Sequence, residues 1–245
     1  MADWTLLQDA YGSAADIPSL IEGWTQQPSD DLMTDLWSRL CHQGTVYPAS
    51  YHALPLLIDA AAQSSPKNRR DLLVLIGAII ASTDGKVVKT ARAAMVDPLL
   101  PRLQLMIDAS MSDGDVDAQE FIYMLQAALA FRDDRFWGQY LDNLAGDEFP
   151  GRCPACEEEF YLAIGQHGFF AVSGDYIREP ERRRVPIKPA PPGNLPRIGA
   201  WLEQEALLHS QNDIAERILY LFGTTACPVC NTSLGVADAV ERAMT

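Results

Sequence analysis

Cys153-Pro154-Ala155-Cys156 returns later in the chain as Cys227-Pro228-Val229-Cys230, and these two stretches decide the fold of the C-terminal part. Two cysteines separated by two residues present both sulfurs to one ion, and two such turns complete a tetrahedral zinc site. The proline in each motif restricts the backbone of the turn. Because the pattern uses four of the five cysteines, we expect one zinc ion with all four cysteines as ligands.

The expected zinc ion is structural, because four thiolates leave no coordination position for a water molecule. A thioredoxin-like redox motif is one alternative. It requires a single Cys-x-x-Cys at the start of a helix in a β-α-β setting, whereas this chain has two motifs and no such setting. A second alternative replaces one cysteine ligand with His167, although a histidine in a turn is more often simply exposed.

The residues around the motifs predict a small α+β module over residues 148–245. Residues 160–172 contain two β-rich runs around a turn bounded by glycines, which predicts a hairpin directly after the first motif. Residues 178–196 hold six prolines and therefore predict a long extended loop, and residues 201–222 return to a helical pattern. The arrangement resembles a zinc ribbon with a longer segment between its two cysteine pairs.

The arginines of that loop, Arg182, Arg183 and Arg184, form a local basic cluster in an acidic protein. The cluster has no interleaved aromatic residues of the kind that single-stranded nucleic-acid sites use. We expect it to be solvated or to contact carboxylates, either within the chain or on a partner.

Residues 1–147 are predicted to form a helical domain. Residues 32–40 repeat apolar pairs every four positions, which places one apolar stripe along a helix, and Ser29 has a side chain suited to cap that helix. Residues 72–81 are apolar on all sides, which is typical of a central buried helix. We expect no strand before Pro150, and the short turns favour stacked antiparallel helix pairs over a compact helical bundle.

Two stretches, Leu36–Ser50 (LWSRLCHQGTVYPAS) and Ala10–Pro18 (AYGSAADIP), resemble a group of bacterial HEAT-repeat-like proteins, and the likeness covers roughly residues 1–90. The resemblance implies an α-solenoid that binds another macromolecule. Members of this broad class are similar to immunity or accessory proteins of bacterial conflict systems. The expected fold class is therefore mainly α, with HEAT-like stacked helix pairs followed by the zinc-binding module.

Adjacent Cys41 and His42 invite a nucleophile-plus-base interpretation. Neighbouring residues on a helix point about 100° apart, however, and Cys41 continues an apolar stripe, so a buried thiol is the expectation. The partner-binding candidates are the polar residues of the loop that follows, together with two acidic residues further along the chain. These candidates are His42, Gln43, Tyr47, Asp133 and Asp134.

The net charge of −14 is concentrated in the first part of the chain, because residues 1–150 carry 21 of the 33 acidic side chains and 10 of the 19 basic ones. Such a field repels nucleic acid and anionic membranes, and it accelerates encounter with a cationic protein. The alternative is that the acidity serves solubility alone. The N-terminal residues do not resemble a signal peptide, and the longest apolar run is too short to span a bilayer, so we expect a cytoplasmic protein.

These observations predict a non-catalytic protein-binding protein, and more specifically an immunity protein that neutralises a cationic bacterial toxin. Two alternatives belong to other classes. The first is a nucleic-acid-associated zinc-ribbon protein, which an acidic chain disfavours. The second is an enzyme whose site these motifs do not reveal.

Overall fold

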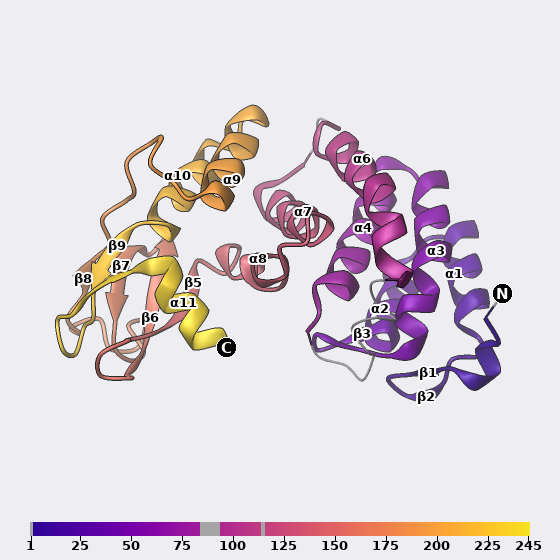
Figure 1. Cartoon of the computed structure of the whole chain (residues 1–245), viewed down its shortest axis with the longest axis horizontal. Helices are drawn as coiled ribbons and strands as arrows, with labels where there is room; N and C mark the ends of the chain where they lie inside the picture. The colour runs from indigo at the N-terminus through magenta and orange to yellow at the C-terminus, as the bar shows by residue number, and fades with distance from the viewer. Residues whose placement is uncertain (1, 84–93, 114–115) are drawn as a thin grey trace. The chain divides into compact units, whose positions relative to one another are not determined.

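The computed structural model describes residues 2–83, 94–113 and 116–245, and the chain divides into two compact units, Met1–Leu141 and Asp142–Thr245 (Figure 1). The described part of the first unit is mostly helical, and the second unit combines strands with helices. The prediction of a mainly helical fold with a smaller α+β part is therefore confirmed at this level. The division lies at residues 141 and 142, whereas the sequence suggested 147 and 148.

The described elements of the first unit are, in chain order, η1 (Trp4–Leu6), β1 (Gln8–Asp9), β2 (Gly12–Ser13), α1 (Ile17–Gln26), α2 (Asp30–Leu40), β3 (Cys41–His42), β4 (Thr45–Val46), α3 (Pro48–Gln63), α4 (Pro66–Ala81), η2 (Asp97–Leu99), α6 (Leu100–Met111), α7 (Ala118–Phe131) and α8 (Arg135–Tyr140).

Helix α4 lies at the centre of this unit. It contacts α3, α6, α7 and α8, and Figure 1 shows it between α3 and α7. Leu75 and Ile76 have no exposed surface, so the prediction of a central buried helix is confirmed. Helices α4 and α7 approach so closely at Gly77 that a Cβ atom there would lie 2.6 Å from the Cβ of Ala127.

Side-chain caps define where three of the helices begin. Ser29, Asp117 and Asp134 each accept the backbone N–H of the residue three positions later, at 3.3, 2.8 and 3.0 Å. These N–H groups have no partner within their own helices, so the caps of α2, α7 and α8 satisfy them.

The expectation that strands are confined to the segment after Pro150 is wrong. The described residues of the first unit include the antiparallel pairs β1–β2 and β3–β4, and strand β5 already begins at Glu148. Gln43 and Gly44 both have positive φ, at 50° and 84°, as a two-residue hairpin turn requires. Strands of two residues are too short to show an alternating pattern in the sequence.

The elements of the second unit are η3 (Leu141–Leu144, which starts at the boundary), β5 (Glu148–Arg152), β6 (Glu159–Gly165), β7 (Gly168–Val172), β8 (Val185–Pro186), α9 (Arg197–Leu208), α10 (Asn212–Leu221), β9 (Thr224–Ala226), β10 (Ser233–Gly235) and α11 (Val236–Met244).

Strands β5, β6, β7 and β8 form one antiparallel sheet in that order, and β9 and β10 form a separate two-stranded ribbon. The predicted hairpin over residues 160–172 is confirmed as β6–β7. Helix α11 packs against β5 and α10 packs against β6. The rings of Phe169 on β7 and Tyr220 on α10 stack with centroids 3.7 Å apart, and Arg217 of α10 pairs with the buried Asp147 at 2.6 Å.

The single helical segment expected over residues 201–222 is two helices. The chain turns between α9 and α10 at Ser210, whose φ of 59° is incompatible with a continuing helix. The N–H of Gln211 donates to the carbonyl of Ala206 and closes the turn. The predicted long loop over residues 178–196 is irregular apart from β8 and one bridge at Lys188.

Candidate metal centre

The two cysteine motifs occupy equivalent hairpin turns. The first connects β5 to β6 beyond the pair Arg152–Glu159, and the second connects β9 to β10 beyond the pair Ala226–Ser233. Each motif is therefore held at both ends by a strand ladder, which brings its first and last residues close together.

Matching backbone hydrogen bonds close the two turns. The N–H of Cys153 donates to the carbonyl of Glu158 at 3.0 Å, and the N–H of Cys227 donates to the carbonyl of Thr232 at 2.9 Å. The residue after each motif has a positive φ, 59° at Glu157 and 63° at Asn231. The two turns thus share one backbone conformation, although their sequences are alike only at the cysteines and the proline.

Backbone N–H groups point at the first sulfur of each motif. Ala155 donates to the sulfur of Cys153 at 3.4 Å, and Val229 donates to the sulfur of Cys227 at the same distance. Cys230 adds a second N–H to the sulfur of Cys227 at 3.5 Å. Hydrogen bonds of this kind favour the thiolate form, which is the form that binds metal.

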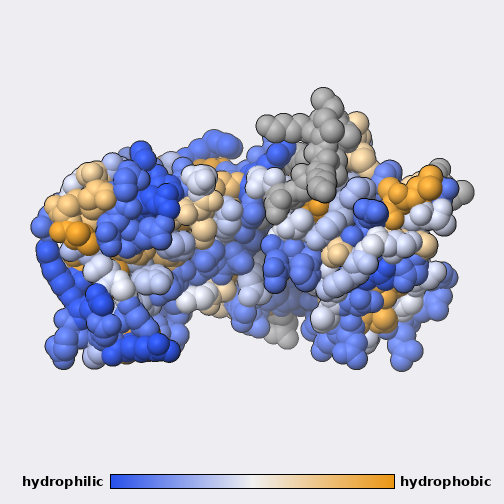
Figure 2. All heavy atoms as spheres, turned by 90° about the horizontal axis from the view of Figure 1, so that it is seen from below, coloured by the Kyte–Doolittle hydropathy of each residue, from blue (hydrophilic) through white to orange (hydrophobic). Residues whose placement is uncertain are grey.

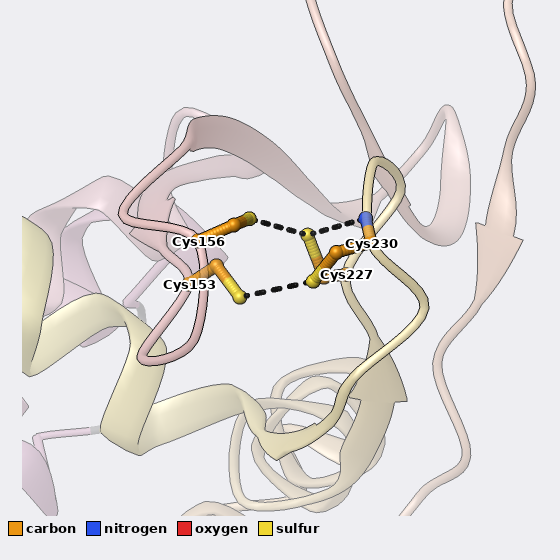
Figure 3. A group of neighbouring side chains, drawn as sticks. All are labelled: Cys153, Cys156, Cys227 and Cys230. Carbon is orange, nitrogen blue, oxygen red and sulfur yellow. Dashed lines mark hydrogen bonds between the residues drawn. The ribbon is translucent and has the colours of Figure 1, made fainter.

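The four sulfur atoms form one cluster in which all lie within 4.8 Å of one another. Figure 3 shows the two motifs facing each other, with the closest sulfurs on opposite hairpins: Cys153 to Cys230 is 3.6 Å, and Cys156 to Cys227 is 3.8 Å. A tetrahedral ion with bonds of about 2.3 Å to sulfur separates its ligands by about 3.8 Å. The four cysteines therefore fit a tetrahedral ion of the size of Zn²⁺.

The cluster shifts the pKa values of its thiols in different directions: that of Cys230 is lowered, and those of Cys156 and Cys227 are raised. The Thr232 hydroxyl, 3.2 Å from the sulfur of Cys230, is the main cause that lowers the pKa of that thiol to about 6. Burial raises the pKa of Cys227. At Cys156 a backbone hydrogen bond from Glu158 lowers the pKa, but contacts with the other three sulfurs and loss of solvent outweigh it and raise the pKa to about 12. Full ionisation of the cluster thus requires a compensating cation.

Arginines from the long loop contact the second unit itself. Arg183 donates to the side-chain oxygen of Asn231 at 2.6 Å, directly beside the second cysteine motif. Arg182 donates to the carbonyl of Ser173 at 2.8 Å, and the guanidinium of Arg184 lies 4.5 Å above the ring of Phe170. One carboxylate contact of the expected kind is present, between Arg182 and Glu179 at 2.9 Å, whereas the other contacts are with an amide oxygen, a backbone carbonyl and an aromatic ring.

His167 does not join the cysteines, since the metal-ligand cluster found among the described residues consists of the four cysteines. It occupies the β6–β7 turn, where its ring meets Tyr176 edge-on at 6.0 Å. Cys41 is buried as expected, but it follows α2 as the first residue of β3 and is not part of the helix. Burial raises the pKa of the Cys41 thiol to about 11.

The five partner-binding candidates lie in two separate regions of the first unit. His42 and Gln43 belong to the β3–β4 hairpin, and Tyr47 precedes α3 as its N-cap. Asp133 and Asp134 form the turn between α7 and α8. Asp133 has a φ of 63°, and Asp134 caps α8, so both acidic residues have local structural roles.

One exposed residue beside these candidates was missed by the sequence reasoning. Tyr11, in the β1–β2 turn, is 69% exposed, and its ring meets that of His42 at 5.7 Å. Arg39, near the end of α2, ties the β1–β2 hairpin and the start of α1 to that helix, because it bonds to Asp9 at 2.6 Å and to Asp16 at 2.6 Å. The two stretches that carry the HEAT-like resemblance, Ala10–Pro18 and Leu36–Ser50, are thus brought together. Tyr11 belongs to Ala10–Pro18, and this membership is the feature of the sequence that could have identified it.

The surface of the first unit has a groove of about 310 Å³ between α1 and α3. Ile21 and Leu56 supply apolar lining, and the carboxylates of Glu22 and Asp59 belong to the same groove. Among the described helices, none is both long enough and apolar enough to cross a membrane. The chain matches no family model, no curated protein and no solved structure.

Proposed function

We propose that this chain is a non-catalytic, cytoplasmic protein-binding protein, in which one structural zinc ion stabilises the second unit and a HEAT-like helical unit engages a cationic protein. The single observation that carries the zinc part is the cluster of four sulfurs at tetrahedral spacing. When bound, zinc supplies a rigid cross-link between the two cysteine hairpins, and its four thiolate ligands leave no position for a substrate or water.

The charge of the helical unit supports a cationic partner. Its described basic side chains already bond to carboxylates or carbonyl groups of the same unit; these are Arg39, Lys67, Arg69, Arg70, Arg102, Arg132 and Arg135. Exposed Glu22 and Asp35, in contrast, form no ion pair with any described cation. A field with this sign steers a cationic protein towards the unit.

The character of the surface supports a polar contact. On the face drawn in Figure 2, hydrophobic side chains form small separate areas among hydrophilic ones. The groove between α1 and α3 joins apolar Leu56 to the carboxylate of Glu22, whereas Asp59 in the same groove already pairs with Arg102 at 2.8 Å. An amphipathic segment that carries both an apolar side chain and lysines or arginines matches that combination.

The specific role that we propose is immunity, in which binding inhibits a basic bacterial toxin. The test uses the protein that this chain captures from the native host, which is then purified and should prove to be cationic. Its association rate with this chain should fall markedly between 0.01 M and 0.1 M salt, because the Debye length decreases from about 30 Å to about 10 Å, while dissociation changes less. Co-expression with this chain should also restore growth to cells that produce the captured protein.

Charge-reversal variants localise the effect. Glu22→Lys with Asp35→Lys should slow association, whereas Glu181→Lys with Glu216→Lys makes the same change in net charge at exposed positions of the second unit. An association rate that does not depend on salt concentration contradicts the proposed electrostatic steering, as do equal effects of the two double variants on that rate. A captured partner that is strongly acidic, or that harms cells regardless of co-expression, contradicts the immunity role.

A further inference from the structure

The four sulfurs of the cluster differ in their access to solvent. Cys153 and Cys227 are buried, whereas Cys156 and Cys230 are exposed. Both kinds of sulfur accept backbone N–H groups, from Ala155 and Val229 at the buried pair and from Glu158 and Thr232 at the exposed pair, so exposure is the property that distinguishes them. Because thiolate character and exposure govern oxidation, a small oxidant in solution meets the exposed sulfurs first.

We propose that Cys156 and Cys230 are oxidation sites, and that hydrogen peroxide converts the zinc-loaded cluster into two disulfides that cross between the hairpins, Cys156–Cys227 and Cys153–Cys230. The zinc ion is lost in this conversion. The inference rests on the proposed zinc site and adds to it a modification at two named residues.

The chemistry balances with peroxide as the oxidant. The exposed thiolate attacks one peroxide oxygen, so that an S–O bond forms, the O–O bond breaks, and a sulfenic acid and hydroxide result. A neighbouring thiolate then attacks the sulfenic sulfur, the S–S bond forms, and the S–O bond breaks to release a second hydroxide. Two electrons pass from the two sulfurs to the two oxygens, and the second disulfide consumes a second peroxide.

The geometry selects which sulfur resolves each sulfenic acid. The sulfur of exposed Cys156 lies 3.8 Å from that of Cys227, and the sulfur of exposed Cys230 lies 3.6 Å from that of Cys153. Both contacts cross from one hairpin to the other (Figure 3). Each exposed sulfur therefore has a buried partner on the opposite hairpin, and the disulfides that form connect the same two turns that zinc connects.

This pairing has a structural consequence. The first disulfide removes two of the four thiolate ligands, so the remaining site binds zinc weakly and releases it. The crossed disulfides then replace the metal as the link between β5–β6 and β9–β10. Zinc release by peroxide should therefore leave the second unit folded.

The test uses purified, zinc-loaded wild-type protein. Its zinc content is measured first and should be about one ion per chain. Hydrogen peroxide is then added in the presence of the chromogenic chelator 4-(2-pyridylazo)resorcinol, which reports free zinc, while circular dichroism follows the fold. Peptide mapping without reduction should identify the two crossed disulfides and a remaining free thiol at Cys41. The Cys41→Ser variant is the matched control and should release zinc at the same rate.

Each outcome separates the two proposals. Protein that contains no zinc before oxidation contradicts the proposed metal site. Protein that is loaded but keeps its zinc under peroxide overturns the oxidation proposal and leaves the metal site standing. Disulfides within the motifs, Cys153–Cys156 and Cys227–Cys230, overturn the crossed pairing, as does loss of the circular-dichroism signal before zinc appears.

Discussion

Asp134 is a residue whose role is interpreted differently once its local structure is known. In the sequence it is an acidic candidate for partner binding, but its carboxylate accepts the N–H of Trp137 at 3.0 Å and caps α8. Replacing it with lysine would remove a cap worth about 1 kcal/mol and place a positive charge at a positive helix end. Glu22 and Asp35 are better probes of the acidic surface, since neither caps a helix.

Cys41 is the residue for which an inert thiol is predicted. Its side chain is buried at the end of α2, and burial raises its pKa to about 11, so very little thiolate is present at neutral pH. Iodoacetamide at pH 7 should leave Cys41 unmodified in the native protein and modify it in urea, as measured by peptide mass spectrometry. Rapid labelling of native Cys41 would restore the nucleophile interpretation.

The packing of α4 against α7 depends on the absence of a side chain at Gly77. A Cβ atom at this position would lie 2.6 Å from the Cβ of Ala127 and 2.7 Å from its Cα, which the two helices cannot accommodate without moving apart. Gly77→Ala should therefore lower the free energy of unfolding by about 1–3 kcal/mol, in spite of the higher helix propensity of alanine.

Gly23 in α1 provides the matched control. A Cβ atom at Gly23 meets no atom within 4 Å, so only helix propensity changes, and Gly23→Ala should raise the free energy of unfolding by up to about 1 kcal/mol. Urea unfolding of both variants measures the difference. Equal effects of the two substitutions would show that close packing at Gly77 does not control stability.

At the scale of the whole molecule, the metal is expected to stabilise one unit and not the other. The cysteine cluster lies entirely in the second unit, Asp142–Thr245, and the first unit has its own core around α4. Because metal binding and folding are coupled, a strong chelator should expose the amides of residues 148–165 and 224–235 to hydrogen exchange while Leu72–Ala81 stays protected.

Cys153→Ser offers an independent check of the same idea, because it removes one ligand without any chelator. It should destabilise the second unit by several kcal/mol and give the same regional exchange pattern. Simultaneous loss of protection in α4 would mean that the two units unfold together.

The sequence by itself determined the features that local interactions encode. The cysteine motifs specify their turns and ligands within four residues, the cap at Ser29 marks a helix start, and the apolar run at 72–81 identifies the central helix. The β6–β7 hairpin could likewise be predicted, because Gly165 and Gly168 flank a two-residue turn. In each case the pattern occupies a short stretch of the chain, so the spacing of neighbouring residues carries the information.

Only the tertiary structure decided what depends on contacts between distant residues. It paired β5 with β6 and β9 with β10 so that two equivalent hairpins face each other, and it left Cys156 and Cys230 exposed while burying their partners. It also placed Tyr11 against His42 and Gly77 against Ala127. Such contacts depend on how the helices and strands pack against one another. Packing depends on whether two surfaces are complementary in shape, and a local sequence pattern describes only one of the two surfaces.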